Sequence, residues 1–250
     1  CLMACAFHPE HPALIAGGTF NGDLFVWDLS QEGDPQRGRS DPLCDVRHQE
    51  PIQSICWQYS LTEAGKYGNR AQAYRLVTLG ADGRVLVWVW HKLAIPLYGY
   101  QLLWPAPGAD RKILWGGTSM SFAIEGLAAR SGGQSSKSEG GAAAAGVGAA
   151  TFMIGTEGGR LFRCYYDVND MAARDFQKAL AGAEGGGTSG SIPELRCPIK
   201  DASYAPHAGA VYGVSCSPFN RDLFLSAGAD GSVRLYHTLK QQPLLTLEPS

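Results

Sequence analysis

Apolar and polar residues alternate in short runs along most of the chain, a pattern typical of β-strands that bury one face. Two stretches repeat nearly the same pattern: residues 76–88 read LVTLGADGRVLVW, and residues 224–236 read FLSAGADGSVRLY. Each has an apolar run, an Asp-Gly pair and a second alternating run that ends in an aromatic residue. The Asp-Gly pair favours a tight turn, because glycine tolerates a positive φ. The sequence therefore predicts two antiparallel hairpins.

Two weaker copies extend the repeat. Residues 14–27 have Asn21-Gly22 at the turn, and the pair Trp27-Asp28 resembles the ending that gives WD repeats their name. Residues 118–122 (TSMSF) and 152–164 (FMIGTEGGRLFRC) form a degenerate copy, with Gly158 at the turn and Cys164 in place of the aromatic residue. We expect this copy to be held by packing.

Polar residues recur at matched positions in the two strong copies. Four positions before an inner strand stands a histidine, and ten positions before the final aromatic residue stands a hydroxyl. In WD repeats such residues resemble a buried relay that runs from the turn aspartate through histidine and hydroxyl to the aromatic ring. The predicted structural relays are His48, Thr78, Asp82 and Trp88 in one copy, and His207, Ser226, Asp230 and Tyr236 in the other.

An Asp-His-Ser set also occurs in hydrolases. Here the hydroxyl lies in the middle of a strand and lacks the sharp turn that exposes a nucleophile. The six histidines do not cluster in the sequence, and no GxxxxGK[ST] phosphate loop is present. We therefore predict a protein that is not an enzyme, with no catalytic, cofactor-binding or metal-binding residues.

The predicted fold is all-β: a WD40 β-propeller with four recognisable blades and Gly/Ala-rich loop insertions. The chain starts at Cys1, inside an expected strand, which favours part of a seven-blade ring over closure with four blades. All of residues 1–250 are assigned to one propeller. The expected parts are blade 1 at 1–47, blade 2 at 48–104, blade 3 at 116–168, a linker with a helix at 169–203, and blade 4 at 204–250.

Several segments interrupt the repeats. Residues 126–150 and 181–191 are rich in Gly, Ala and Ser, so we expect loops there, the first between the two inner strands of blade 3. Residues 169–180 predict a helix capped by Asn169 or Asp170, with Met171, Phe176 and Leu180 as its apolar positions. Residues 61–72 are an insertion in blade 2, and residues 98–104 are its expected outer strand.

Composition narrows the function classes. The net charge of −2 gives no basic field for nucleic acid, and no apolar run is long enough to cross a membrane. The seven cysteines form no CxxC pair, so neither a zinc site nor a disulfide framework is indicated. We expect a reduced, intracellular compartment.

Beyond the generic repeat, the motifs resemble dynein intermediate chains. AFHPEHPALIAGGTFNGDLFVWDL, then TSMSF and GTEGG, then HAGAVYGVSCSPFNRDLFLSAGADGSVRLY occur in the order of that family. The block VSCSPFNRDLFLSAG is most similar to the intermediate chain of the intraflagellar-transport dynein, the cytoplasmic type 2 motor. The Gly/Ala-rich insertions fall outside the resemblance.

The resemblance implies a non-catalytic motor subunit whose propeller binds the tail of a dynein heavy chain. It implies a role in retrograde intraflagellar transport and cilium assembly, in the cytoplasm, the cytoskeleton and the cilium with its base. Further expected partners are intraflagellar-transport train proteins, and a second intermediate chain and light chains bound through regions outside this segment. The alternatives are an axonemal dynein intermediate chain or a general WD40 scaffold, such as a substrate adaptor of a ubiquitin ligase.

Four residues are candidate partner contacts. Phe20 is an apolar ring expected at a hairpin tip, where water exposure is costly unless a partner covers it. Glu157 holds the corresponding position in the degenerate copy, Arg84 follows the Asp82 turn, and Trp90 lies two residues beyond Trp88. Packing within the ring is the alternative interpretation for each.

Overall fold

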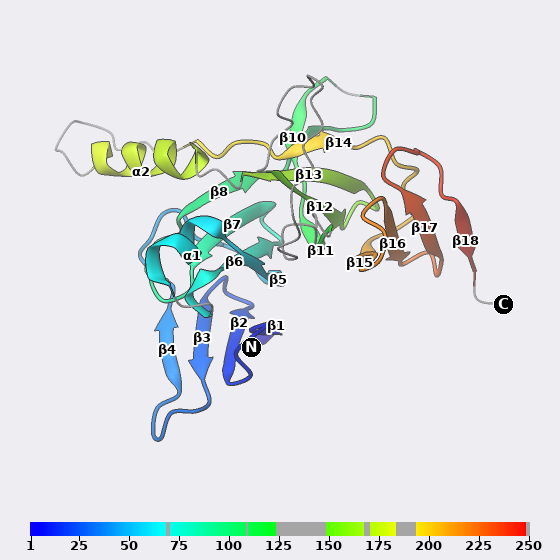
Figure 1. Cartoon of the computed structure of the whole chain (residues 1–250). Helices are drawn as coiled ribbons and strands as arrows, with labels where there is room; N and C mark the ends of the chain where they lie inside the picture. Colours follow the sequence, from blue (N-terminus) through cyan, green and yellow to red (C-terminus); the bar gives the residue numbers. More distant parts are fainter. Residues whose placement is uncertain (69–70, 109, 124–148, 168–170, 184–193, 249–250) are drawn as a thin grey trace, which may run out of the picture.

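The computed structural model describes residues 1–68, 71–108, 110–123, 149–167, 171–183 and 194–248. Within these residues the strands form four antiparallel sheets of four strands and one separate pair of strands (Figure 1). The strands of each sheet follow chain order, so neighbours in the sheet are neighbours in the sequence. This repeated meander confirms the predicted all-β class and is consistent with propeller blades.

The first two sheets contain the hairpins predicted at residues 14–27 and 76–88. The first sheet consists of β1 (Leu2–Phe7), β2 (Leu14–Thr19), β3 (Leu24–Asp28) and β4 (Gln36–Arg39). The second consists of β5 (Ile52–Tyr59), β6 (Tyr74–Gly80), β7 (Arg84–Val89) and β8 (Tyr98–Gln101). Gly22 and Gly83 adopt positive φ at the two turns, as the turn sequences require.

The third and fourth sheets repeat the arrangement. The third consists of β11 (Gly117–Phe122), β12 (Ala149–Thr156), β13 (Leu161–Asp167) and β14 (Ile199–Asp201). The fourth consists of β15 (Val211–Cys216), β16 (Leu223–Gly228), β17 (Val233–His237) and β18 (Leu245–Leu247). The separate pair is β9 (Leu103–Pro105) with β10 (Lys112–Leu114), between the second and third sheets in the sequence.

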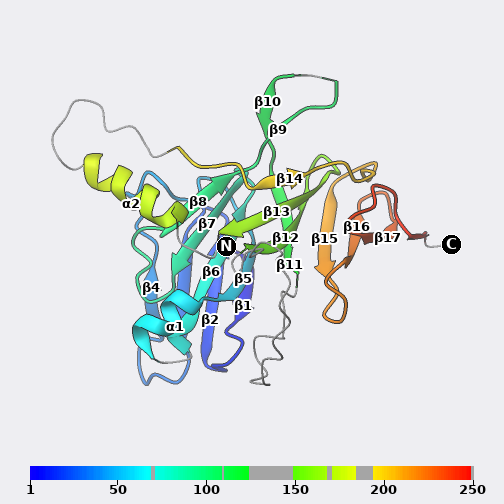
Figure 2. The ribbon, with the colours of Figure 1, turned by 45° about the horizontal axis from the view of Figure 1, so that its top comes forward.

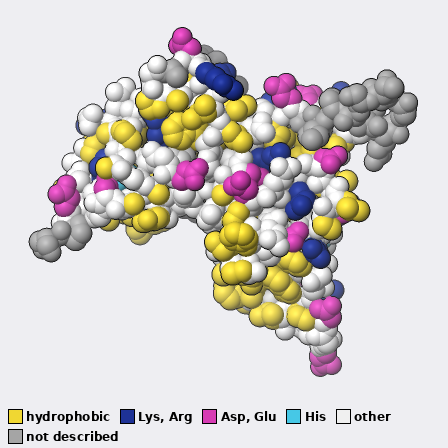
Figure 3. Space-filling view, turned by 180° about the vertical axis from the view of Figure 1, so that it is seen from behind, with side chains coloured by type: hydrophobic (Ala, Val, Ile, Leu, Met, Phe, Trp, Pro, Cys, Tyr) yellow, Lys and Arg dark blue, Asp and Glu magenta, His cyan; other side chains and the backbone are white. Residues whose placement is uncertain are grey.

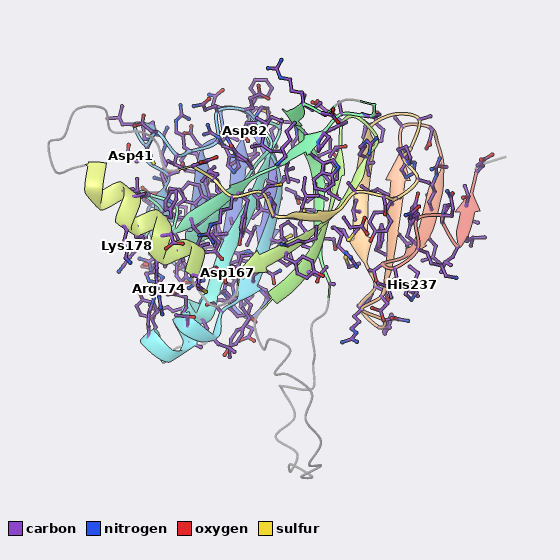
Figure 4. The ribbon with its side chains drawn as sticks, turned by 90° about the horizontal axis from the view of Figure 1, so that it is seen from above. Asp41, Asp82, Asp167, Arg174, Lys178 and His237 are labelled. Carbon is purple, nitrogen blue, oxygen red and sulfur yellow. The ribbon has the colours of Figure 1, made fainter. Side chains whose placement is uncertain are left out.

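Successive sheets lie side by side in a row, with the fourth at one end (Figure 4). The inner strands make the junctions: β5 contacts β1 and β2, β11 contacts β5 and β6, and β15 contacts β11 and β12. Glycine permits close approach at two junctions, where Gly18 lies against Ile52 and Gly155 lies against Val211. Apolar side chains from the first three sheets merge into one core, and a second cluster joins the third and fourth sheets.

All hairpin turns between second and third strands lie at one edge of the sheets, together with the loops that lead into the inner strands. We call this the turn edge. The loops that join first to second strands and third to fourth strands lie at the opposite edge. Residues on the turn edge therefore come from all four sheets, although they are far apart in the sequence.

The motif TSMSF, in β11, joins the third sheet to the fourth. The Ser119 and Ser121 hydroxyls accept hydrogen bonds from the backbone N–H groups of Val214 and Cys216, both at 2.9 Å. The Thr118 hydroxyl donates to the carbonyl of Val211. The innermost strand of a sheet has no further strand to satisfy its outward backbone groups. The side chains of β11 supply those partners for β15.

Helix α1 (Leu61–Tyr67) and the short 3₁₀ helix η1 (Ala71–Ala73) occupy the insertion in the second sheet. The Ser60 hydroxyl accepts a hydrogen bond from the N–H of Glu63, an N-cap that begins the helix. Glu63 is itself buried and pairs with the buried Arg75 of β6 at 2.7 Å. This pair fixes α1 to the sheet.

Helix α2 (Met171–Ala183) covers β8, the outer strand of the second sheet (Figure 2). Phe176 is buried as predicted, but Met171 is exposed, so its assignment to the apolar face was wrong. The N–H of Ala172 donates to the Asp167 carboxylate at 2.8 Å; the predicted caps Asn169 and Asp170 lie outside the described residues. The helix continues through Ala183, so the loop predicted at 181–191 begins too early.

Three other predicted boundaries need correction. Strand β14 lies inside the segment assigned to a linker, because the chain returns from α2 to pair with β13 and complete the third sheet. The outer strand predicted at 98–104 ends at Gln101, and Leu103 begins β9 instead. Residues 126–148 of the predicted loop lie outside the described residues, but Ala149 and Ala150 belong to β12. A local sequence pattern does not show that the chain returns to complete a sheet after an inserted helix or loop.

The sheets at the two ends of the row leave apolar faces exposed. In the first sheet, Leu2, Met3 and Phe7 are exposed, and apolar side chains gather over this sheet in Figure 3. In the fourth sheet, Leu225, Leu235 and Leu245 form one cross-strand row, of which Leu225 and Leu245 are exposed. No helix of the described residues is long and apolar enough to cross a membrane.

Candidate functional site

The second sheet contains a continuous hydrogen-bond chain at its turn edge. Trp88 donates from Nε1 to the Thr78 hydroxyl at 2.9 Å, and that hydroxyl lies 2.7 Å from His48 Nε2. His48 Nδ1 lies 3.1 Å from the Asp82 carboxylate. A neutral imidazole with its proton on Nδ1 satisfies every member: it donates to Asp82 and accepts from Thr78. The loop before β5 is thereby tied to the turn between β6 and β7.

Asp82 is the charged residue at the end of this series of hydrogen bonds. Burial would raise its pKa, but hydrogen bonds from His48 and from the N–H groups of Gln49 and Arg84 outweigh burial and lower it. The carboxylate is therefore ionised at neutral pH and fully hydrogen-bonded. A partly buried, fully hydrogen-bonded carboxylate next to a buried imidazole stabilises a turn but offers no open position for a substrate.

The fourth sheet has a shorter version of this series of hydrogen bonds. His207 lies 2.9 Å from the Asp230 carboxylate through Nδ1 and 2.7 Å from the Ser226 hydroxyl through Nε2. Tyr236 does not join: its hydroxyl donates instead to the carbonyl of Ala205, at 2.7 Å. The inclusion of Tyr236 was wrong because a tyrosine carries its polar atom at the far end of the ring, beyond the reach of Ser226.

Two residues that the sequence reasoning missed complete this site. The Ser232 hydroxyl lies 2.8 Å from Asp230 and 3.2 Å from His207 Nδ1, and Arg234 pairs with Asp230 at 3.0 Å. Burial would raise the pKa of Asp230, but hydrogen bonds from His207, the N–H of Ala208 and Ser232 hold it well below its usual value. The sequence could have indicated both residues, because Ser232 and Arg234 follow the turn aspartate at short spacings on the same hairpin.

The third sheet replaces the relay with an aromatic ring. Trp115, from the loop before β11, covers Gly158 so closely that a methyl group there would lie 2.6 Å from its ring. The ring also packs edge-on against Phe162, at 5.8 Å between centroids, and Arg160 lies over its face. Trp115 Nε1 donates to the carbonyl of Trp104 at 3.0 Å. The indole thus occupies the space that an aspartate side chain would need.

The four candidate partner contacts are not gathered at one place. Phe20 lies at the turn edge with 57% of its surface exposed, and Glu157 is exposed at the same edge. Arg84 donates to the carbonyl of Arg47 at 2.7 Å and is largely buried, so it braces the loop before β5. Trp90 follows β7 at the opposite edge and packs partly against the core. Phe20 and Glu157 are therefore the two of the four that the structure leaves accessible at the turn edge.

Among the described residues, no group of three or more His, Cys, Asp and Glu side chains is arranged to hold a metal ion. The buried imidazoles of His48 and His207 are committed to their turns. The turn edge therefore presents hairpin tips and loops that these hydrogen bonds hold in place.

Comparison with known proteins shows what these repeats are similar to. A family model described as "WD domain, G-beta repeat" matches residues 200–237, which include β15, β16 and β17 of the fourth sheet. Cytoplasmic dynein 2 intermediate chain 2 of Mus musculus is 33% identical over the whole chain, and its Homo sapiens counterpart is 31% identical. This chain is a WD-repeat homologue of dynein intermediate chains.

The chain spans about 40% of the length of both mammalian relatives. The 70 kDa intermediate chain of the Chlamydomonas reinhardtii flagellar outer arm is 24% identical over 98% of the chain, which spans 32% of that relative. All three relatives are described as dynein intermediate chains. The predicted resemblance to the type 2 intermediate chain is confirmed.

Proposed function

We propose that this chain is part of a non-catalytic intermediate-chain subunit of a dynein motor, and that its propeller binds the tail of the dynein heavy chain. The observation that carries the proposal is the similarity over the full chain to two cytoplasmic dynein 2 intermediate chains. The structure supports a binding role, because the polar clusters around His48 and His207 hold turns in place and offer no open position for a substrate. Preformed loops bind without a large ordering cost.

The exposed apolar faces of the first and fourth sheets support a larger ring. Faces of this kind are buried between neighbouring sheets elsewhere in the row. We propose that further sheets cover them in a seven-blade propeller, which would leave the turn edge as one continuous rim. Phe20 and Glu157 would then be partner contacts on that rim.

The wider role follows from the same similarity. We propose retrograde intraflagellar transport and cilium assembly as the process, with action in the cytoplasm, at the cytoskeleton and in the cilium and its base. Transport-train proteins, a second intermediate chain and light chains are further proposed partners, the last two through regions outside this segment. The flagellar outer-arm relative supports an axonemal subunit as the second candidate, at lower identity.

The binding surface can be tested by changing Phe20 to Ala in the full-length protein. An aromatic anchor in a desolvated interface contributes about 2 kcal/mol or more, so the affinity for a dynein heavy-chain tail should fall about thirtyfold. The fold should be nearly unaffected, because Phe20 is mostly exposed. Phe219→Ala is the matched control, since Phe219 is 97% exposed at the opposite edge. Equal affinities for both variants and the wild type would exclude Phe20 from the interface.

A further inference from the structure

The strand pair β9 and β10 stands clear of the four sheets in both views of the ribbon (Figures 1 and 2). Its base rests on the turn edge, where Leu114 lies against Gly83 at the turn of the second sheet. Within the described residues, no third strand pairs with it. A two-stranded sheet has two outer edges with backbone groups available for another strand.

The hydrogen-bond pattern shows which groups point outward. The N–H of Trp115 donates to the carbonyl of Leu102 at 3.0 Å, next to the paired residues of the hairpin. Hydrogen-bonded and non-hydrogen-bonded pairs alternate along antiparallel strands. Ile113 and Trp104 therefore form the next bonded pair. The backbone N–H and C=O groups of Lys112 and Leu114 point away from β9.

The other edge of the hairpin is a poor template. By the same alternation, β9 would offer the backbone of Leu103 and Pro105 on its outer side. Proline has no N–H to donate, and the carbonyl of Leu103 already accepts from the Cys197 thiol at 3.1 Å. The edge of β10 has neither obstacle.

The hairpin is braced for binding. Leu102 donates its N–H to the carbonyl of Gly83 at 2.9 Å, and the Trp115 indole bonds to the carbonyl of Trp104. The first contact ties the base of the hairpin to the turn of the second sheet, and Trp115 also lies against Gly158 at the turn of the third sheet. A partner strand would meet an edge already ordered, which lowers the entropic cost of pairing.

The side chains around β10 indicate which charge a partner strand should carry. Arg111 and Lys112 are exposed, and within the described part of the chain neither has an ion-pair partner. Ile113 and Leu114 are 40% and 46% exposed beside them. We propose that β10 binds an extended acidic segment of another polypeptide as a third strand, through the backbone groups of Lys112 and Leu114. This contact is separate from the proposed heavy-chain contact and needs no motor subunit.

The test uses two synthetic peptides of alternating sequence, Glu-Val-Glu-Val-Glu-Val-Glu and its lysine counterpart, with capped ends. Amide hydrogen exchange of the full-length protein is measured with each peptide at low salt. The acidic peptide should slow exchange at Lys112 and Leu114 by about tenfold or more and leave Ile113 unchanged, since Ile113 already pairs with Trp104. The lysine peptide should give no protection.

Charge reversal supplies the second arm. The double variant Arg111→Glu with Lys112→Glu should lose protection by the acidic peptide and gain it with the lysine peptide. Arg174→Glu with Lys178→Glu, the same charge change on the exposed side of α2 (Figure 4), should behave as the wild type. Unchanged exchange at Lys112 and Leu114, protection by both peptides alike, or protection only at β4, β14 or β18 would each overturn the proposal.

Discussion

The second and third sheets form the same hairpin turn with opposite chemistry. In the second sheet, His48 and Asp82 tie the incoming loop to the turn through buried hydrogen bonds. In the third, Trp115 makes the same loop-to-turn connection by covering Gly158. Both arrangements fill the space between loop and turn, so the fold requires the connection but not a particular set of residues. A repeat that has glycine at the turn and lacks the relay can therefore hold the same turn by packing an aromatic ring against it.

The largest effect should come from removing the relay. His48→Ala removes one hydrogen-bond partner from Asp82 and one from Thr78, and should lower the free energy of unfolding by about 1–3 kcal/mol. Denaturant titration of the full-length protein measures it. His237→Ala is the matched control, because that half-buried imidazole accepts a single bond, from the N–H of Leu239. An unchanged midpoint for His48→Ala would show that the relay does not hold the second sheet.

A smaller effect should come from crowding the third sheet. Gly158→Ala places a methyl group against the Trp115 ring and should cost about 1–2 kcal/mol through overpacking. Adding Trp115→Leu to this variant should relieve the crowding, so the double variant should be less destabilised than the sum of the single changes. Strict additivity in the unfolding free energies would contradict the assigned contact.

The smallest effect is a local dependence on pH. The lowered pKa of Asp82 means that its contribution to stability is complete above the ordinary aspartate pKa of 3.8 and is lost as pH falls through the folded value. Gly158 carries no titrating group. Acidification below pH 3.8, with exchange rates corrected for intrinsic pH dependence, should therefore open the Gly83 amide more than the Gly159 amide. Equal opening at both turns would remove the electrostatic difference between the sheets.

The part of the molecule that the sequence predicted well is local. Asp82-Gly83 and Asp230-Gly231 each sit between two strands of one hairpin, so turn chemistry and alternation are enough to place them. The spacing of His48 to its strand also carried the relay, because WD repeats keep that spacing. Tyr236 has the expected spacing from Ser226, but its hydroxyl lies too far along the ring to bond to Ser226. The sequence spacing does not show this difference.

The parts that sequence reasoning missed depend on residues distant in the chain. Strand β14 completes the third sheet after α2 and its flanking segments have intervened, and no local pattern reports that return. The hydroxyls of TSMSF serve the backbone of β15, about 95 residues further on. The role of Trp115 was equally hidden, since its partner Gly158 lies in another hairpin and glycine gives no chemical signal.

The most direct test of the account is reconstitution with the motor. The full-length protein is co-expressed with the tail of the cytoplasmic dynein 2 heavy chain and, separately, with the tail of a flagellar outer-arm heavy chain, and each mixture is examined by size-exclusion chromatography with light scattering. The account predicts a stable complex with the dynein 2 tail and weaker or no association with the outer-arm tail. Separate elution from both tails, with the protein folded, would contradict it.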